Sequence, residues 1–115
     1  MNFPFSKLRH AHGFVFLSGE LPIAEDGTVP EGIRAQTSLA LRRIEATLAG
    51  AGLTLSDVVQ VTVHLIDTAD FAEFNAAYLK HFSAPLPTRT TVIAQLALPA
   101  VRVELTVVAA APTGV

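Results

Sequence analysis

The segment that most restricts the fold lies near the end of the chain, at residues 101–109. It reads V-R-V-E-L-T-V-V-A, and its apolar residues stand at both strand parities, which is typical of a strand covered on both faces. Half of the 115 residues are apolar and only 16% are charged, against about 25% in an average soluble domain. One small core cannot hide this much apolar surface, so we expect a partner subunit to cover one face of the sheet.

Composition also excludes several classes of protein. Eight basic residues against ten acidic ones give a net charge of -2 and a pI near 6.0, unlike the basic surface of a nucleic-acid binder. The longest apolar run, 107–112, is far shorter than the ~20 residues of a membrane span, and the first ten residues do not resemble a secretory signal. Cysteine is absent, which removes disulfides and thiolate chemistry. We therefore expect one cytoplasmic, oligomeric domain over residues 1–115 that binds neither nucleic acid nor membrane.

Two segments carry the apolar spacing of amphipathic helices. In residues 31–52, apolar side chains recur three or four apart, with Pro30 before the segment and Gly50 and Gly52 at its end. Residues 70–82 repeat aromatic side chains at the same spacing. Both segments are predicted to be helices that cover a sheet. The aromatic residues of the second segment are Phe71, Phe74, Tyr78 and Phe82.

Short runs of β-branched and aromatic residues make up the rest of the pattern. A hairpin is predicted from strands at 6–11 and 14–18, joined by a turn at His12-Gly13. The order β-β-α-β-α-β-β predicts an α+β domain with two helices on one face of the sheet. The remaining strands are predicted at 58–66, 90–96 and 101–109.

Arg89 is the charged residue with the fewest local partners. It follows Pro87-Thr88, and no acidic residue stands between Glu73 and Glu104. A guanidinium near the start of a strand can bind a carboxylate ligand through two parallel hydrogen bonds. The alternative is an ordinary solvated arginine, and the residues alone leave both interpretations open.

Glu104 stands in the middle of an otherwise apolar strand. It shares the parity of Arg102, so both side chains belong to the same face. One interpretation is an ion pair on a solvent face, formed by Arg102 with Glu104 of a neighbouring strand. The other is a half-buried carboxylate that activates water. Two further candidates are weaker: Ser18 is a lone serine at a strand end, and the pair His10 and His12 lacks a third metal ligand.

Six short motifs follow one another along nearly the whole chain. They are P-F-S-K at 4–7, F-V-F-L-S-G-E-L-P at 14–22, Q-T at 36–37 with the helix end at 48–52, D-V-V-Q-V-T-V-H-L at 57–65, F-N-A-A-Y at 74–78, and P-T-R-T-T-V at 87–92 followed by L-P at 98–99 and V-E-L at 103–105. Each motif is weak alone. In this order they resemble the Rid (reactive intermediate deaminase) family, also known as YjgF-type proteins.

The resemblance implies a chorismate-mutase-like fold with a mostly antiparallel sheet, assembled as a homotrimer with a cleft between each pair of adjacent subunits. It implies hydrolysis of the C=N bond of reactive 2-imino or enamine acids, such as 2-iminopropanoate, to a 2-keto acid and ammonia. Neither a cofactor nor a metal is implied. An adjacent subunit that covers the sheet is consistent with the high content of apolar residues.

Carried over residue by residue, the resemblance assigns roles at four positions. Arg89 matches the arginine that grips the substrate carboxylate, and Glu104 matches the carboxylate that positions and activates the attacking water. Ser18 matches a serine that lines the pocket. The backbone at Thr91 matches the segment whose carbonyl meets the substrate nitrogen.

The chain departs from the family pattern at two positions of the same pocket. Phe5 stands where the family usually has tyrosine, which removes a hydroxyl, and Glu20 replaces a common glutamine, which adds a negative charge. We expect Phe5 to alter substrate preference or rate more than it abolishes the chemistry. Two alternatives remain: a trimeric module that binds small carboxylates without turnover, and an RNA-cleaving or translation-inhibiting protein, against which the acidic balance argues.

Overall fold

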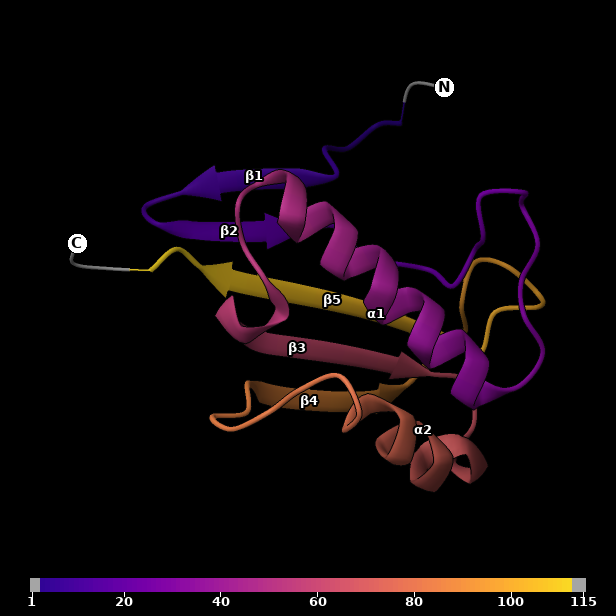
Figure 1. Ribbon diagram of the computed structural model, residues 1–115. Helices are drawn as coiled ribbons and strands as arrows, with labels where there is room; N and C mark the ends of the chain where they lie inside the picture. The colour runs from indigo at the N-terminus through magenta and orange to yellow at the C-terminus, as the bar shows by residue number, and fades with distance from the viewer. Residues whose placement is uncertain (1–2, 113–115) are drawn as a thin grey trace.

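The computed structural model describes residues 3–112, in which two helices lie across one face of a five-stranded sheet (Figure 1). The elements appear in the predicted order and confirm the α+β fold class. Two short 3-10 helices, η1 (Leu55–Asp57) and η2 (Thr68–Asp70), precede β3 and α2. The strands are β1 (Leu8–Ala11), β2 (Phe14–Leu17), β3 (Val58–Leu65), β4 (Thr88–Ile93) and β5 (Val103–Ala110), and the helices are α1 (Ile33–Gly50) and α2 (Phe71–Tyr78).

The C-terminal strand β5 lies at the centre of the sheet, whose strand order is β1-β2-β5-β3-β4. It pairs antiparallel with both β2 and β3. The β3–β4 pair is parallel. Helix α2 lies between these two strands in the chain and forms the crossover that lets β4 run in the same direction as β3. The prediction of a mostly antiparallel sheet is therefore confirmed.

Side chains alternate strictly along β5, and this alternation separates the two faces of the sheet. Val103, Leu105, Val107 and Ala109 are buried beneath the helices, whereas the residues between them are only partly buried. We call the face that carries these partly buried residues, on the side away from the helices, the open face. It carries large exposed apolar side chains from other strands as well, including Phe14, Phe16 and Val92.

The core lies between the helices and the covered face of the sheet. Its largest fully buried side chains come from every layer: Phe74 from α2, Leu41 from α1 and Leu105 from β5. Helix α1 buries one face only, which confirms the predicted amphipathic pattern. The buried residues of α1 are Ile33, Gln36, Thr37, Ala40, Leu41, Ile44 and Leu48.

The hairpin turn forms where the sequence predicts it. His12 and Gly13 both have positive φ, 53° and 82°, as a two-residue turn with the right-handed twist of a hairpin requires. The register then pairs Leu8 with Leu17 and His10 with Val15. His12 therefore lies in the turn and not on a strand face beside His10.

Several predicted boundaries are wrong by a few residues. The second helix, predicted at 70–82, is regular only over Phe71–Tyr78, because the N–H groups of the next turn donate to carbonyls three residues back. This tighter turn still holds Phe82 against Tyr78, with ring centroids 4.7 Å apart. The strand predicted at 90–96 begins earlier and spans Thr88–Ile93, and the strand predicted at 101–109 spans Val103–Ala110.

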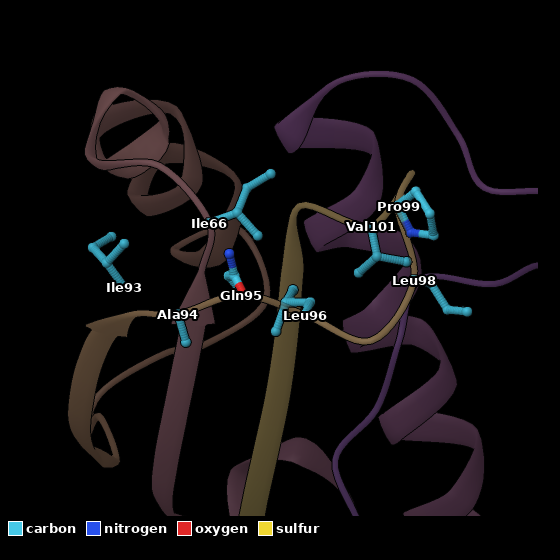
Figure 2. Close-up of a pocket in the computed structure, with 8 residues that line it drawn as sticks. All are labelled: Ile66, Ile93, Ala94, Gln95, Leu96, Leu98, Pro99 and Val101. Carbon is cyan, nitrogen blue, oxygen red and sulfur yellow. The ribbon is translucent and has the colours of Figure 1, made fainter.

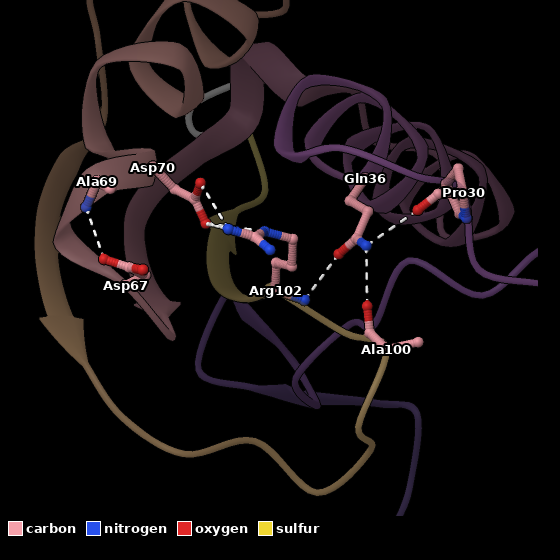
Figure 3. A network of polar contacts seen from close by, with 7 residues as sticks. All are labelled: Pro30, Gln36, Asp67, Ala69, Asp70, Ala100 and Arg102. Atoms are coloured by element: carbon pink, nitrogen blue, oxygen red, sulfur yellow. Dashed lines mark hydrogen bonds and ion pairs between the residues drawn. The ribbon is translucent and has the colours of Figure 1, made fainter.

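A buried polar network fixes the loop that leads into β5 (Figure 3). Gln36 of α1 is 2% exposed; its Nε2 donates to the carbonyls of Pro30 and Ala100, both at 3.0 Å, and its Oε1 accepts from the Arg102 N–H at 2.8 Å. The Arg102 guanidinium then binds both carboxylate oxygens of Asp70, at 2.9 and 3.0 Å. Arg102 is therefore paired with Asp70 of its own chain, which argues against the interpretation of Arg102 as the ion-pair partner of Glu104.

We expect Gln36→Leu to lower the free energy of unfolding by about 2–4 kcal/mol, because it removes the three hydrogen bonds that the buried amide makes to backbone groups of Pro30, Ala100 and Arg102. Denaturant titration at one fixed protein concentration measures the change. Gln95→Leu, at an exposed position, is the matched control and should change stability by less than about 0.5 kcal/mol. Equal effects from the two substitutions would contradict this role of Gln36.

Candidate functional site

Arg89 lies on an aromatic surface formed by α2. Its register partner on β3 is Val61, so its side chain belongs to the helix-covered face of the sheet. The guanidinium carbon stands 5.8, 5.3 and 4.9 Å from the ring centroids of Phe71, Phe74 and Tyr78. All three distances are within the ~6 Å over which a ring attracts a cation. The predicted spacing of aromatic residues along the helix is what places the rings side by side.

No carboxylate among residues 3–112 forms an ion pair with Arg89. Its donors are therefore available for an anion from outside the chain. The hydroxyl of Tyr78, whose ring contacts Arg89, is buried without a hydrogen-bond partner among the described residues. Burial raises the pKa of Tyr78, and the positive charge of Arg89 opposes that rise. The cluster thus combines a cation that has no carboxylate partner with the unused hydroxyl of Tyr78.

Glu104 lies on the open face of β5, directly opposite His64 of β3. The two side chains are each 30% exposed, and His64 Nδ1 is 3.7 Å from Glu104 Oε1. Among residues 3–112, no arginine or lysine pairs with this carboxylate. Glu104 is therefore a partly buried carboxylate that has no arginine or lysine partner in the described part of the chain.

A bulge after β2 brings Gly19 over Glu104. Phe16 pairs with Val108 and Glu20 pairs with Leu105. The chain that follows β2 therefore has one residue more than β5 between these two pairs, which defines a β-bulge. A Cβ on Gly19 would stand 2.8 Å from the Glu104 Cδ and 2.9 Å from its Oε2. Only glycine leaves room for the carboxylate at this position.

The same bulge attaches the N-terminal segment. Ser18 Oγ donates to the Ser6 carbonyl at 2.6 Å, and the Ser18 N–H donates to the Lys7 carbonyl at 3.1 Å. Phe5, 57% exposed, then lies beside a cavity of about 160 Å³ that Ser18 and Glu20 also line. The other residues lining it are Phe3, Lys7, Gly19, Leu21, Ile23 and Arg43.

The charge of Glu20 is compensated within the chain. Its carboxylate pairs with Arg43 of α1 at 3.0 Å and with Lys7 at 3.7 Å, and its side chain is only 12% exposed. The bulge causes this orientation, because it turns Glu20 to the side of its bridge partner Leu105 and away from Glu104. The negative charge that this substitution adds is therefore largely neutralised by two cations.

The six predicted site residues form two groups in one chain. Phe5, Ser18 and Glu20 share a cavity that adjoins Glu104 across Gly19. Arg89 and Thr91 stand together on β4, opposite Val61 and Val63 on the covered face. Because β3 separates β4 from β5 and the two charged side chains belong to opposite faces, one small molecule cannot touch both Arg89 and Glu104 of the same chain.

A larger cavity, of about 560 Å³, lies elsewhere, at the end of β4 and under the loop that leads to β5 (Figure 2). Its side chains are apolar except for Gln95, and none of the predicted site residues lines it. It offers no charged group for a carboxylate or for acid–base chemistry. The residues around it are Ile66, Ile93, Ala94, Gln95, Leu96, Leu98, Pro99 and Val101.

Sequence reasoning missed three features of the site. The aromatic residues of α2 were predicted only as a core-facing stripe, and their spacing was the signal that they could also flank a cation. His64 was not distinguished from other strand residues, since its pairing with Glu104 depends on the register of β3 and β5. Gly19 was part of a motif, but its contact with Glu104 depends on the bulge.

Fold and site together define a class of small α+β proteins: a helix-covered, mostly antiparallel sheet with an unpaired arginine at one edge and a half-buried carboxylate at its centre. Residues 2–111 match the family described as Endoribonuclease L-PSP, the YjgF/RutC family. The chain belongs to this family, which confirms the resemblance to Rid proteins.

Individual relatives agree with this assignment. A RutC family protein of Pyrococcus horikoshii is 40% identical over 91 residues, which cover 77% of this chain and 72% of the relative. Reactive Intermediate Deaminase A of Arabidopsis thaliana, named as chloroplastic, is 41% identical over 90 residues, 76% of this chain and 48% of that protein. The crystal structure of Escherichia coli TdcF with bound serine superposes with a TM-score of 0.88 at 28% identity, covering 97% of this chain and 91% of that one.

Location in the cell is a separate question. No helix among residues 3–112 is both long and apolar enough to span a membrane. The cytoplasmic location stays a prediction, because the family includes a relative named as chloroplastic.

We expect Gly19→Ala to displace the Glu104 carboxylate while changing the free energy of unfolding by less than about 1 kcal/mol. The new Cβ meets the mobile end of a side chain, which can move aside. A crystal structure and a melting curve of the variant measure the two effects. Gly50→Ala is the control, since nothing lies within 4 Å of a Cβ there. An unmoved Glu104 in Gly19→Ala would show that the contact does not restrict the carboxylate.

Proposed function

We propose that this protein hydrolyses reactive 2-imino acids and their enamine tautomers, such as 2-iminopropanoate, to 2-keto acids and ammonia. The observation that carries the proposal is Arg89, a partly buried guanidinium held by aromatic rings and paired with no carboxylate of the described chain. It is suited to bind a small carboxylate through two hydrogen bonds. The name of the Arabidopsis relative and the serine bound to TdcF, itself a small carboxylate, support the same substrate class.

The reaction needs little beyond orientation and one base. Arg89 holds the substrate carboxylate, so that the protonated C=N carbon faces the water beside Glu104. Glu104 accepts a proton from this water as its oxygen bonds to the carbon, which gives a carbinolamine. The carboxyl group returns the proton to nitrogen, the C–N bond breaks, and the hydroxyl proton is released as the keto group forms. The products are the 2-keto acid and ammonium, and neither a metal nor a cofactor takes part in this scheme.

The two groups of site residues belong to adjacent copies of the chain in this proposal. Within one chain Arg89 and Glu104 occupy opposite faces of the sheet, so a complete site requires a second copy. The open face also exposes Phe14 and Phe16, at 44% and 45%, which a subunit contact would cover. We therefore propose the homotrimer with intersubunit sites that the family resemblance implies.

The same assay separates this proposal from its alternatives. Imine is generated from an amino acid by an amino acid oxidase, and its disappearance is followed with and without the protein. Binding of pyruvate without faster imine loss would identify a carboxylate-binding module instead. Salt-dependent binding and cleavage of RNA at physiological ionic strength would favour the endoribonuclease activity in the family's description, which the net charge of -2 opposes.

We expect Arg89→Ala to reduce kcat/KM for imine hydrolysis about 100-fold, since it removes a bidentate, charge-assisted contact. Arg89→Lys should recover only part of this loss, because lysine keeps the charge but not the planar pair of donors. Arg34→Ala is the control: this arginine is exposed and pairs with Glu73 on the surface. Full activity in Arg89→Ala would overturn the proposed role.

Mixing two inactive variants tests whether the site is shared between copies. Glu104→Gln should lose about 100-fold or more in kcat, because the amide cannot accept the proton of water. When Arg89→Ala and Glu104→Gln are unfolded together at equal amounts and refolded, we expect about a quarter of wild-type activity, the share of sites that draw both intact residues from different copies. Sites built within one chain would give no recovery. Refolded wild-type protein is the control.

A further inference from the structure

His64 is the one side chain of the described structure within ion-pair distance of Glu104. The two residues are direct partners in the antiparallel register of β3 and β5, where opposite side chains stand close together. The distance from His64 Nδ1 to Glu104 Oε1 is 3.7 Å. His64 Nδ1 is buried and has no hydrogen-bond partner among residues 3–112. A buried donor or acceptor without a partner is costly, so this nitrogen requires an explanation.

The surroundings of His64 offer few other partners. On the opposite side from β5, the register partner of His64 is Val92 of β4, which cannot form a hydrogen bond. Among residues 3–112, Glu104 is the acidic residue within ion-pair distance of the ring. The Glu104 carboxylate in turn forms no hydrogen bond with another side chain or backbone group of the described residues. Among the described residues, each of the two groups is therefore the one ion-pair partner that the other has.

We propose that His64 is a positioning residue for Glu104. The inference rests on the function proposed above. The imidazole carries a proton on Nδ1 and donates it to Glu104 Oε1, which fixes the plane of the carboxylate against Gly19. The present separation is longer than a hydrogen bond, and a small rotation of either side chain closes it when substrate binds. Without this donor the carboxylate is free to rotate, and fewer of its orientations face the attacking water.

Three substitutions of His64 separate the position of the donor from the presence of a side chain. Asparagine places its amide nitrogen near the position of Nδ1, glutamine places it near that of Nε2, and leucine offers no donor. We expect His64→Leu and His64→Gln to lower kcat for imine hydrolysis about tenfold with KM changed less than twofold, because only the orientation of the base is lost. His64→Asn should keep kcat within about threefold of wild type.

Two controls accompany these variants. His12→Asn, in the exposed hairpin turn, is the matched control for introducing asparagine, and it should retain wild-type kinetics. Melting temperatures identify any variant that is merely unstable. Wild-type kcat in His64→Leu would overturn the proposal, as would an equal loss in all three variants, since a structural role does not depend on where the donor stands.

The tautomer of His64 gives a test that does not depend on activity. We expect nitrogen NMR at alkaline pH to show His64 protonated on Nδ1 in the wild-type protein and on Nε2 in Glu104→Ala. The spectrum of His81, which contacts Ser38 of α1 and forms no ion pair with Glu104, should not change and serves as the internal reference. Protonation of His64 on Nε2 in the wild-type protein would overturn the proposal. A wild-type protein that shows the Nδ1 tautomer but does not hydrolyse imines would overturn the proposed function and leave the pairing established.

Discussion

The alternation of side chains along β5 is the constraint on which the rest of the structure depends. Because β5 is the central strand, its odd-numbered residues must be apolar to pack against the helices. The register with β5 then determines which residues of the neighbouring strands face the helices and which lie on the open face. Glu104 is tolerated in this strand only because it has the parity of the open face. The same alternation assigns Arg89, two strands away, to the covered face. The separation of the two charged groups is thus a consequence of strand pairing, not of any local preference of either residue.

Arg89 can remain without an acidic partner because its surroundings are aromatic. Each ring of Phe71, Phe74 and Tyr78 presents electron density to the guanidinium, and contacts of this kind contribute about 0.5–2 kcal/mol each. They stabilise the cation without occupying its N–H donors. A carboxylate at the same place would also stabilise the charge, but it would use the donors that a ligand needs. An aromatic surface is therefore the kind of support that holds a cation ready for an anionic ligand.

Much of the fold could be predicted from the sequence, and the site only in part. The hairpin, both helices and the order of strands follow from periodicity and turn residues such as His12-Gly13, which act locally. The end of α2 could not be predicted, since the aromatic stripe continues to Phe82 through a tighter turn. The bulge at Ser18-Gly19 and the pairing of His64 with Glu104 depend on register, which joins residues far apart in the chain. The roles proposed for Arg89 and Glu104 rest on a family resemblance, because residue type alone left each undecided.

The low charge content of the chain takes on a different meaning once the ion pairs are known. Glu20 is matched by Arg43 and Lys7, and Arg102 is matched by Asp70, so these charges stabilise the fold and contribute little field beyond it. Among residues 3–112, the basic side chains outside any ion pair are exposed to solvent, with the exception of Arg89. Glu104 is likewise the partly buried carboxylate whose one charge contact is an imidazole. A partly buried cation and a partly buried carboxylate interact more strongly with a ligand between them than fully exposed charges would. An assembly that brings them together from two copies would create a polar site at an otherwise apolar contact.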